Sequence, residues 1–266
     1  MAVQVDDIGL LTIVQHVDLD VEEDEETIAS VIVVVEDAEK QQHHHLRSIA
    51  SALVIRQIPS QGISFQLWPA ATSFLTLLDH NTSCTPLTPF LSKSQRILEL
   101  GSGTGLVGIA AAATLGAYVT LTDLPHVLPN LQFNADANAH ALAFNCGTVH
   151  VASLRWGEAE DMESVGREFD LLLASDVVYH DHLFDPLLQT VHFFLSGDNS
   201  PVFLMAHLKR WKKKDSVFFK KARKMFHVEM IHSDPPSPGS RVGVAFYLFT
   251  RKCGNGKLTS QTMPVP

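Results

Sequence analysis

The segment from Arg96 to Gly108, RILELGSGTGLVG, restricts the fold more than any other part of the chain. Its apolar residues Ile97, Leu98 and Leu100 predict a buried strand, and three glycines follow within five positions. Glycine allows a sharp turn and lets the backbone approach a ligand that any Cβ would push away. Residues 106–115 predict a helix whose first N–H groups face that ligand. The segment therefore predicts a strand, a turn and a helix that cradle a nucleotide-like molecule.

The register of the glycines and one carboxylate indicate which molecule is bound. Gly103, Gly105 and Gly108 fit the dinucleotide pattern G-x-G-x-x-G, but the glycine that directly follows the strand is Gly101. Glu99, near the strand end, would repel a pyrophosphate but can accept a hydrogen bond from an ammonium group. S-adenosylmethionine carries an amino group and a sulfonium but no phosphate. The turn predicts an S-adenosylmethionine site, with a dinucleotide site and an empty tight turn as the alternatives.

The charge of the chain is unevenly distributed. Residues 1–57 hold 12 acidic and 3 basic residues, and the remaining chain holds 17 of each sign. A balanced core offers no electrostatic footprint for duplex nucleic acid or for an anionic membrane. With 266 residues and 45% apolar content, the chain can bury one sizeable core. We expect an acidic N-terminal extension with short strands over residues 1–57 and a methyltransferase domain over residues 58–266.

Cysteine usage and hydropathy indicate the compartment. Cys84, Cys146 and Cys253 show no C-x-x-C spacing, which indicates neither a disulfide framework nor a zinc site. No apolar run approaches the roughly 20 residues that cross a bilayer, and no signal-peptide core follows the N-terminus. We expect no metal, no membrane partner and a cytoplasmic location, with the nucleus as the alternative.

Strand-like and helix-like segments alternate from Arg96 onward, which is typical of a parallel sheet covered on both faces. Residues 234–241, DPPSPGSR, are too short and too rich in proline for a crossover helix, so the last two strands should form an antiparallel hairpin. The predicted fold is α/β: a seven-stranded, mostly parallel Rossmann-like methyltransferase sheet with a C-terminal antiparallel hairpin and an N-terminal β extension. The predicted strands are residues 96–100, 118–123, 148–154, 169–175, 201–207, 227–232 and 242–250.

The segments before the glycine turn are less regular. Residues 54–65 predict a small hairpin around 59–62, and residues 70–78 predict a helix. The acidic run 22–26 is interpreted as a solvated loop, with a docking surface as the alternative. The three histidines 43–45 are interpreted as exposed surface.

The basic segment 209–224 combines lysines with aromatic residues. Because Val217, Phe218 and Met225 recur at helical spacing, it predicts an amphipathic helix with a solvated lysine face, and RNA binding or substrate docking are the alternatives.

Chemically useful residues follow the ends of the predicted strands. Asp123 lies where a carboxylate can accept hydrogen bonds from both ribose hydroxyls, with a helix N-cap as its alternative role. Trp156 can cover an adenine ring or pack in the core. Asp176 ends an apolar strand, where its desolvation favours a functional role: orienting an incoming ammonium group beside Tyr179. A helix cap plus a core tyrosine is the alternative for this last pair.

With these residues in place, the chain resembles the seven-β-strand protein-lysine methyltransferases of methyltransferase family 16, the methyltransferase-like twenty-one group. The resemblance implies that a cofactor site is formed by Trp68, Gly101, Ser102, Gly103, Asp123, Trp156 and Ser175, with Glu99 and Gly105 in the same turn. It also implies that Asp176 to Tyr179 form the D-x-x-Y signature, with Asp176 and Tyr179 as the catalytic residues. The matching segments are LWPAA at 67–71, ILELGSGTGLVGIAAA at 97–112, LTDLPHVLPNLQFNADAN at 121–138, LRWGE at 154–158 and DLLLASDVVYHDHLFDPLL at 170–188.

The resemblance implies methyl transfer from S-adenosylmethionine to the ε-amine of lysine in a non-histone protein. A methyltransferase for a small metabolite and an inactive cofactor-binding module are the alternatives. RNA methylation is disfavoured because the N-P-P-Y motif of amino-methylating nucleic-acid enzymes is replaced by D-V-V-Y. A helical lid is common in metabolite enzymes, whereas a short hairpin at 54–65 would leave the pocket open to a protein.

Overall fold

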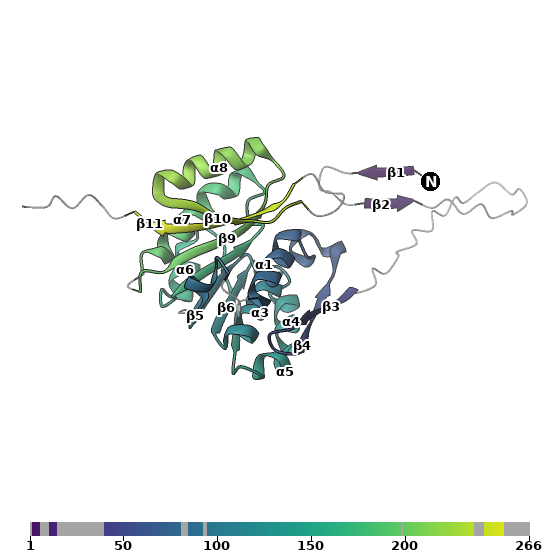
Figure 1. Cartoon of the computed structure of the whole chain (residues 1–266). Coiled ribbons are helices and arrows are strands. Elements are labelled where there is room, and N and C mark those ends of the chain that lie inside the picture. Colours follow the sequence, from purple (N-terminus) through teal and green to yellow (C-terminus); the bar gives the residue numbers. More distant parts are fainter. Residues whose placement is uncertain are drawn as a thin grey trace, which may run out of the picture.

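The computed structural model describes residues 2–5, 11–14, 40–80, 85–92, 95–197, 199–236 and 242–252 (Figure 1). The acidic run 22–26, Cys84 and Cys253 lie outside the described residues. The central sheet has seven strands in the order β10-β11-β9-β8-β5-β6-β7. These strands are β5 (Arg96–Leu100), β6 (Tyr118–Asp123), β7 (Thr148–Ser153), β8 (Leu171–Ser175), β9 (Val202–Leu208), β10 (Phe226–Ser233) and β11 (Val244–Arg251).

The sheet is parallel from β7 to β9 and antiparallel at its C-terminal edge. β5 runs parallel to β6 and β8, and β8 runs parallel to β9. β11 pairs antiparallel with both β9 and β10. The predicted α/β class, the seven-stranded sheet and the C-terminal hairpin are therefore confirmed.

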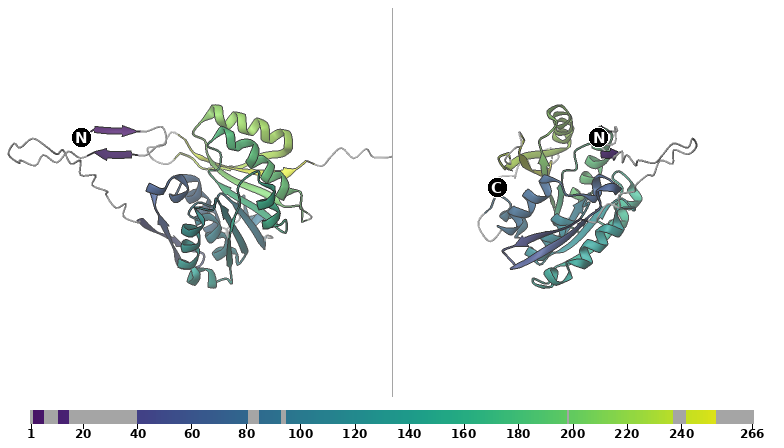
Figure 2. Two further views of the ribbon diagram at one scale, coloured as in Figure 1. Left: turned by 180° about the vertical axis from the view of Figure 1, so that it is seen from behind. Right: turned by 90° about the vertical axis from the view of Figure 1, so that its right-hand side faces the viewer.

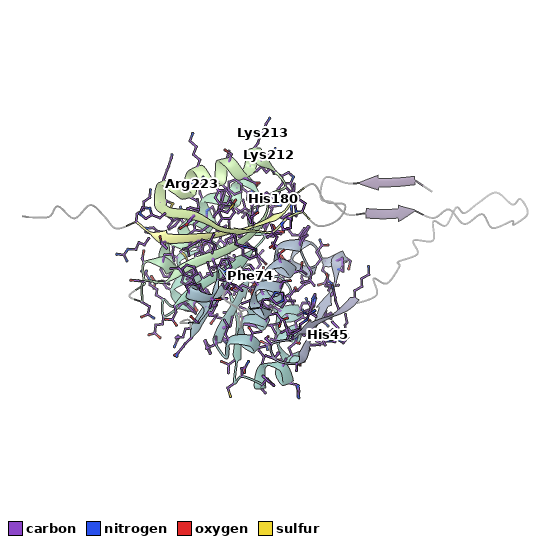
Figure 3. All side chains as sticks on the ribbon, viewed as in Figure 1. His45, Phe74, His180, Lys212, Lys213 and Arg223 are labelled. Atoms are coloured by element: carbon purple, nitrogen blue, oxygen red, sulfur yellow. The ribbon has the colours of Figure 1, made fainter. Side chains whose placement is uncertain are left out.

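Two helical layers cover the sheet, as Figures 1 and 2 show. Alternate side chains of each strand enter opposite layers, as period-two alternation requires: Ile97 packs in one core and Leu98 in the other. Phe74, labelled in Figure 3, is fully buried in the first of these cores. One face carries α1 (Pro69–Asp79), α3 (Leu106–Leu115), α4 (Leu128–Ala137) and α5 (Ala139–Ala143). The other carries α6 (Ala159–Val165), α7 (Phe184–Leu195) and α8 (Lys212–Met225), while α2 (Thr88–Leu91) contributes Leu91 to the first face.

The predicted hairpin within residues 54–65 is wrong. β4 (Ser51–Gln57) pairs antiparallel with the preceding strand, β3 (Lys40–Leu46), so that Lys40 lies opposite Gln57. After β4 the chain forms two short 3-10 turns, η1 (Pro59–Gln61) and η2 (Ile63–Phe65). The strand partner is the polar segment that carries the histidines, which shows little hydrophobic pattern in the sequence. Proline and glycine here mark two tight turns instead of a strand reversal.

The histidine tract is part of β3, and only two of its members match the exposed surface predicted for them. His43 and His45 are exposed, whereas His44 is buried. Strand alternation explains this difference, because successive side chains point to opposite faces. β1 (Ala2–Val5) and β2 (Leu11–Val14) form a separate antiparallel pair.

The β3–β4 hairpin is bound to the helical layer. The backbone N–H groups of Val54 and Arg56 donate to the Oδ1 atoms of Asn138 and Asn134, each at 2.8 Å. Leu53 and Ile55 are fully buried. These contacts cross the expected division at residue 57, which remains a prediction.

The amphipathic helix predicted in the basic segment is present as α8. Its buried side includes Phe218, Phe219 and Ala222. Val217, expected on that side, is 49% exposed. The helix begins at Lys212, and its register turns Val217 away from the core.

Candidate active site

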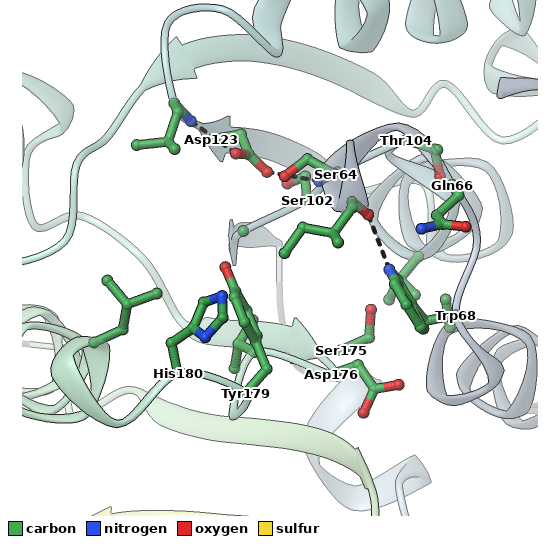
Figure 4. A pocket seen from close by; sticks show the side chains of 18 of the residues that line it. Ser64, Gln66, Trp68, Ser102, Thr104, Asp123, Ser175, Asp176, Tyr179 and His180 are labelled. Atoms are coloured by element: carbon green, nitrogen blue, oxygen red, sulfur yellow. Dashed lines mark hydrogen bonds between the residues drawn. The ribbon is translucent and has the colours of Figure 1, made fainter. Parts of the chain in front are cut away.

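A cavity of about 460 Å³ lies at the carboxyl edge of the sheet (Figure 4). It is lined by residues that follow β5, β6, β7, β8 and β9, and by the segment between η2 and α1. This edge is where open α/β sheets bind ligands, and the volume suits a small molecule. The predicted site residues that line it are Trp68, Gly101, Ser102, Gly103, Asp123, Trp156, Ser175, Asp176 and Tyr179.

The glycine turn has the conformation and the room that a ligand cradle needs. Gly101 and Gly103 have φ values of +62° and +55°, in the left-handed region that glycine favours. A Cβ on Gly101 would lie 2.9 Å from the Trp156 ring, and one on Gly103 would lie 3.1 Å from the Ser64 carbonyl oxygen. A side chain at either position would collide with these residues of the cavity wall. The turn therefore fits a nucleoside-bearing cofactor such as S-adenosylmethionine.

Asp123 is held in place by backbone donors. Its Oδ2 accepts from the Gly103 N–H and its Oδ1 from the Leu124 N–H, each at 2.8 Å. Burial raises the pKa of this carboxyl, and the two N–H donors oppose the shift. Each carboxylate oxygen has a second lone pair, which leaves capacity for ligand hydroxyls. The N-cap alternative is not seen, because α4 begins at Leu128 and has no side-chain cap.

Ser102 connects the turn to the neighbouring strand. Its N–H donates to the Thr122 carbonyl at 2.9 Å, and its Oγ accepts from the Thr122 N–H at 3.1 Å. These two hydrogen bonds fix the turn relative to the end of β6. The donor end of the cavity, defined here as Gly101, Ser102, Gly103 and Asp123, is thus held mainly by main-chain groups.

Glu99 and Gly105 do not line the cavity. Glu99 is 1% exposed, and its Oε2 accepts from the Gly108 N–H at 3.1 Å in the first turn of α3. Burial raises its pKa to about 8. A Cβ on Gly105 would lie 2.6 Å from Leu131, so this glycine serves core packing. Alternation along β5 places Glu99 on the same face as Ile97, beneath α3 instead of at the ligand edge.

Two tryptophans lie at the cavity wall. Trp156 is partly buried and lies against Gly101, where a flat ligand ring can pack on it. Trp68 directly precedes α1, and its Nε1–H donates to the Ile63 carbonyl at 2.9 Å. This hydrogen bond ties the η2 segment to the cavity wall.

Asp176 has an unusual backbone and a charged partner. Its φ is +58°, a conformation that is uncommon for residues other than glycine and that clusters at functional sites. Its side chain is 4% exposed, with Oδ2 at 2.6 Å from Nη2 of Arg210. Its Oδ1 accepts from the Leu208 N–H at 3.0 Å. Burial raises the pKa of Asp176, and the Arg210 guanidinium opposes this shift.

His207 and Asp215 form a second buried pair next to Asp176. The ring of His207, whose side chain is 1% exposed, has its Nδ1 3.8 Å from Asp176 Oδ1 and its Nε2 3.1 Å from Asp215 Oδ1. Burial lowers the pKa of His207, which favours the neutral imidazole. Asp176, Arg210, His207 and Asp215, which we call the acceptor cluster, thus connect the ends of β8 and β9 to the first turn of α8.

Tyr179 lines the cavity beside the acceptor cluster. In Figure 4 its hydroxyl points toward the side of the cavity where Ser102 and Asp123 lie. Burial raises the pKa of this phenol to about 12, and the nearby charge of Asp123 adds to the shift. The ring packs edge-on against His180, with centroids 4.9 Å apart. Tyr179 therefore remains a neutral hydroxyl donor at physiological pH.

Sequence reasoning missed several lining residues. Ile63, Ser64 and Gln66 lie in or next to the segment predicted as a hairpin, and Arg210, Trp211 and Lys214 lie in the segment predicted as a solvated helix. The sequence could have indicated Arg210, Trp211 and Lys214, because Arg210 follows the carboxyl end of the predicted strand that became β9. That end lies at the same sheet edge as Asp176. The Arg210 guanidinium also lies over the rings of Trp68 and Trp211, at 5.0 and 5.2 Å.

Within the residues that the structure describes, no helix combines the length and apolarity needed to cross a membrane.

Comparisons with known proteins indicate the family of this chain. A family model described as lysine methyltransferase matches residues 47–225. Protein N-lysine methyltransferase METTL21A of Danio rerio is 36% identical over 173 residues, which are 65% of this chain and 73% of the relative. EEF1A lysine methyltransferase 3 of Xenopus tropicalis is 36% identical over 118 residues, 44% of this chain and 49% of the relative. A solved transferase structure from Pyrococcus horikoshii, 11% identical, matches the fold with a TM-score of 0.50 over 81% of this chain and 74% of that one.

Proposed function

Because the chain belongs to the lysine methyltransferase family, we propose that it transfers a methyl group from S-adenosylmethionine to the ε-amine of lysine in a non-histone protein. One observation carries the proposal: a single cavity joins the glycine turn and Asp123 to Asp176 and Tyr179. The relatives named above are lysine methyltransferases with protein substrates in their names. This supports an active enzyme over an inactive binding module.

The donor end of the cavity would hold the cofactor. Asp123 would accept hydrogen bonds from the ribose hydroxyls, and Trp156 would cover the base. Gly101 and Gly103 would leave room for the backbone to approach. The cofactor supplies an electrophilic methyl group on a sulfonium centre.

The acceptor side would prepare the lysine. An ammonium group has no free lone pair, so the amine must be neutral when it attacks. The fixed positive charge of Arg210, 2.6 Å from Asp176, favours the neutral form of an amine that arrives beside it. Asp176 and Tyr179 would orient that amine by hydrogen bonds. The aromatic rings of Tyr179 and Trp68 would stabilise the positive charge that develops on the lysine nitrogen during methyl transfer.

A small-metabolite methyltransferase is the second candidate. The expected distinction between a hairpin and a helical lid no longer applies, because residues 59–65 form two 3-10 turns. The choice of a protein substrate rests instead on the family.

The test is to incubate the purified full-length protein with methyl-labelled cofactor and a lysate of its own cells. We expect label in protein, recovered as methylated lysine after hydrolysis and mass spectrometry. The Asp176→Asn variant serves as the matched inactive control. Label recovered only in small molecules or in RNA would overturn the proposal.

A further inference from the structure

The mouth of the cavity carries both cationic and apolar side chains. The cationic ones, which we call the basic rim, are Arg210, Lys212, Lys213 and Lys214, at and just before the start of α8. Arg210 and Lys214 line the cavity itself, and Lys212 and Lys213 extend the charge outward from it. Figure 3 shows these two lysines at one end of α8, with Arg223 toward the other end.

The two outer lysines of the basic rim are available for a partner. Lys214 has Asp181 Oδ1 3.6 Å away, and Arg210 is paired with Asp176. Lys212 and Lys213 are exposed, and no carboxylate of the described chain lies within ion-pair distance of either. Farther along α8, by contrast, Lys221 pairs with Asp185 at 2.7 Å.

Exposed apolar side chains also line the cavity. Ile63 and Leu124 are 41% and 42% exposed. Trp211, at the basic rim, is 41% exposed as well. A ligand that covers the mouth can therefore bury apolar surface and place negative charge against the basic rim.

We propose that the basic rim docks an acidic segment of the protein substrate, so that the enzyme selects a lysine with acidic neighbours. This inference rests on the proposed function and names its substrate class. A lysine that approaches alone meets the unpaired charges of Lys212 and Lys213, which repel its ammonium group. Acidic residues next to the substrate lysine offset that repulsion. Once the lysine has entered the cavity, the positive charge of Arg210 can still favour the neutral form of its amine.

The chemistry of the rim favours an acidic protein over nucleic acid. Nonspecific nucleic-acid binding needs a basic surface that follows several phosphates, with aromatic stacking platforms for single strands. Here the two unpaired lysines beside the cavity are Lys212 and Lys213, and Trp211 is the aromatic residue at that end of α8. The other exposed lysines of α8, Lys220 and Lys224, lie toward its far end and do not line the cavity. The remainder of the chain after residue 57 has equal numbers of acidic and basic residues.

The test compares two double variants on the same helix. Lys212→Glu with Lys213→Glu reverses the basic rim. Lys220→Glu with Lys224→Glu makes the same charge change at exposed positions six or more residues along the helix from Lys214, about 9 Å or more from the rim. The substrates are two synthetic peptides of equal length with one lysine, one flanked by glutamates and one by serines, and the lysate proteins labelled by the wild type.

We expect the rim variant to raise KM for the glutamate peptide at least about tenfold, with kcat and cofactor affinity within about twofold of wild type. The control variant should stay within about twofold in all three. Wild-type kcat/KM should fall as salt rises from 50 to 300 mM, and the rim variant should show a flatter dependence.

Several outcomes would overturn the inference. One is equal loss in both double variants, and another is preference of the wild type for the serine peptide. A third is stronger competition by poly-uridine than by poly-glutamate at equal charge, which would assign the rim to nucleic acid. If wild type labels lysate lysines and the rim variant labels them as fast as the control, the docking surface fails and the proposed function stands. If wild type labels neither peptides nor lysate proteins, the proposed function itself fails.

Discussion

The two ends of the cavity are held by different kinds of interaction. At the donor end, main-chain N–H groups of Gly103 and Leu124 fix the Asp123 carboxylate, and positive-φ glycines shape the wall. At the acceptor end, a guanidinium, an imidazole and two carboxylates form the acceptor cluster around one strained backbone position, Asp176. The donor end thus depends on backbone conformation, and the acceptor end depends on paired side chains.

This difference predicts how each end tolerates change. Main-chain N–H donors are kept in every substitution except one by proline, so the donor end should fail mainly when a side chain intrudes. A side-chain cluster loses its geometry when one charged member is replaced, because its partner is left buried and unpaired. Substitutions at the donor end should change cofactor affinity, and substitutions at the acceptor end should change turnover.

The largest effect is expected from Gly103→Val. The φ of +55° is unfavourable for a branched residue, and the added side chain would meet the Ser64 carbonyl. We expect cofactor affinity to fall at least about 100-fold, which corresponds to roughly 3 kcal/mol. Calorimetry with S-adenosylmethionine and its demethylated product measures this loss.

Gly166→Val is the matched control for that variant. Gly166 has φ of +81°, and no atom lies within 4 Å of the position that a Cβ would take, so the backbone strain is present without intrusion into the cavity. It should lower thermal stability and leave cofactor affinity unchanged. Normal binding by folded Gly103→Val, or preferred binding of NAD by the wild type, would contradict the assignment of the donor end.

The next largest effect is expected from Asp176→Asn. Asparagine tolerates positive φ, so the backbone is retained while the charge that faces Arg210 is lost. We expect turnover at saturating cofactor to fall by at least about two orders of magnitude, or on the order of 3 kcal/mol, with cofactor affinity changed less than about threefold. Full transfer to protein lysine by this variant would remove Asp176 from the reaction.

The same contrast explains what the sequence could predict. The strand, turn and helix around Gly101 and Gly103 follow from local backbone preferences, so their positions were predicted correctly. The acceptor cluster could not be assembled in this way, because Arg210 lies 34 positions from Asp176 and within a run that also fits an exposed helix face. Its members meet only because β8 and β9 are neighbours in the sheet.

The position of Glu99 away from the cavity and the error in the N-terminal hairpin have a related cause. The acidic strand end is visible in the sequence, but whether Glu99 faces the ligand or the helix depends on which layer covers that face of β5. The partner of β4 was missed because β3 is a polar segment with three consecutive histidines, and its pairing is visible only in three dimensions.

A smaller effect is expected at Asp123, where two N–H donors already occupy part of the carboxylate. Asp123→Ala removes the acceptor for ribose hydroxyls and leaves those donors unpaired. We expect cofactor affinity to weaken by about 1 to 3 kcal/mol. Turnover at saturating cofactor should change less than affinity, which steady-state kinetics at several cofactor concentrations can separate. A larger change in turnover than in affinity would break the proposed division between the two ends.

Glu99 provides a test on stability instead of binding. Its pKa is about 8 in the folded protein and 4.5 in the unfolded chain, so between these values the folded state keeps a proton that the unfolded state has released. Its contribution to stability is complete below pH 4.5 and is lost as pH rises through about 8. Compared with Glu99→Gln, wild type should lose about 1 kcal/mol of unfolding free energy per pH unit near pH 6 to 7. Denaturant unfolding of both proteins over this range measures the difference, and parallel pH profiles would contradict the buried assignment.

The smallest effect is expected from removing residues 1–39. The predicted cofactor contacts begin at Trp68, so cofactor affinity should change less than about twofold, or roughly 0.4 kcal/mol. Deleting residues 1–57 is the comparison, because it also removes β3 and β4. That deletion breaks the hydrogen bonds from Val54 and Arg56 to α4 and its C-terminal end, and it exposes the surface that Leu53 and Ile55 cover. Since each of these buried side chains stabilises by about 1.5 to 3 kcal/mol, the longer deletion should lower the melting temperature markedly. Equal melting temperatures would place the domain boundary at residue 57, whereas loss of cofactor binding by the shorter, folded chain would show that the acidic extension contributes to the donor end.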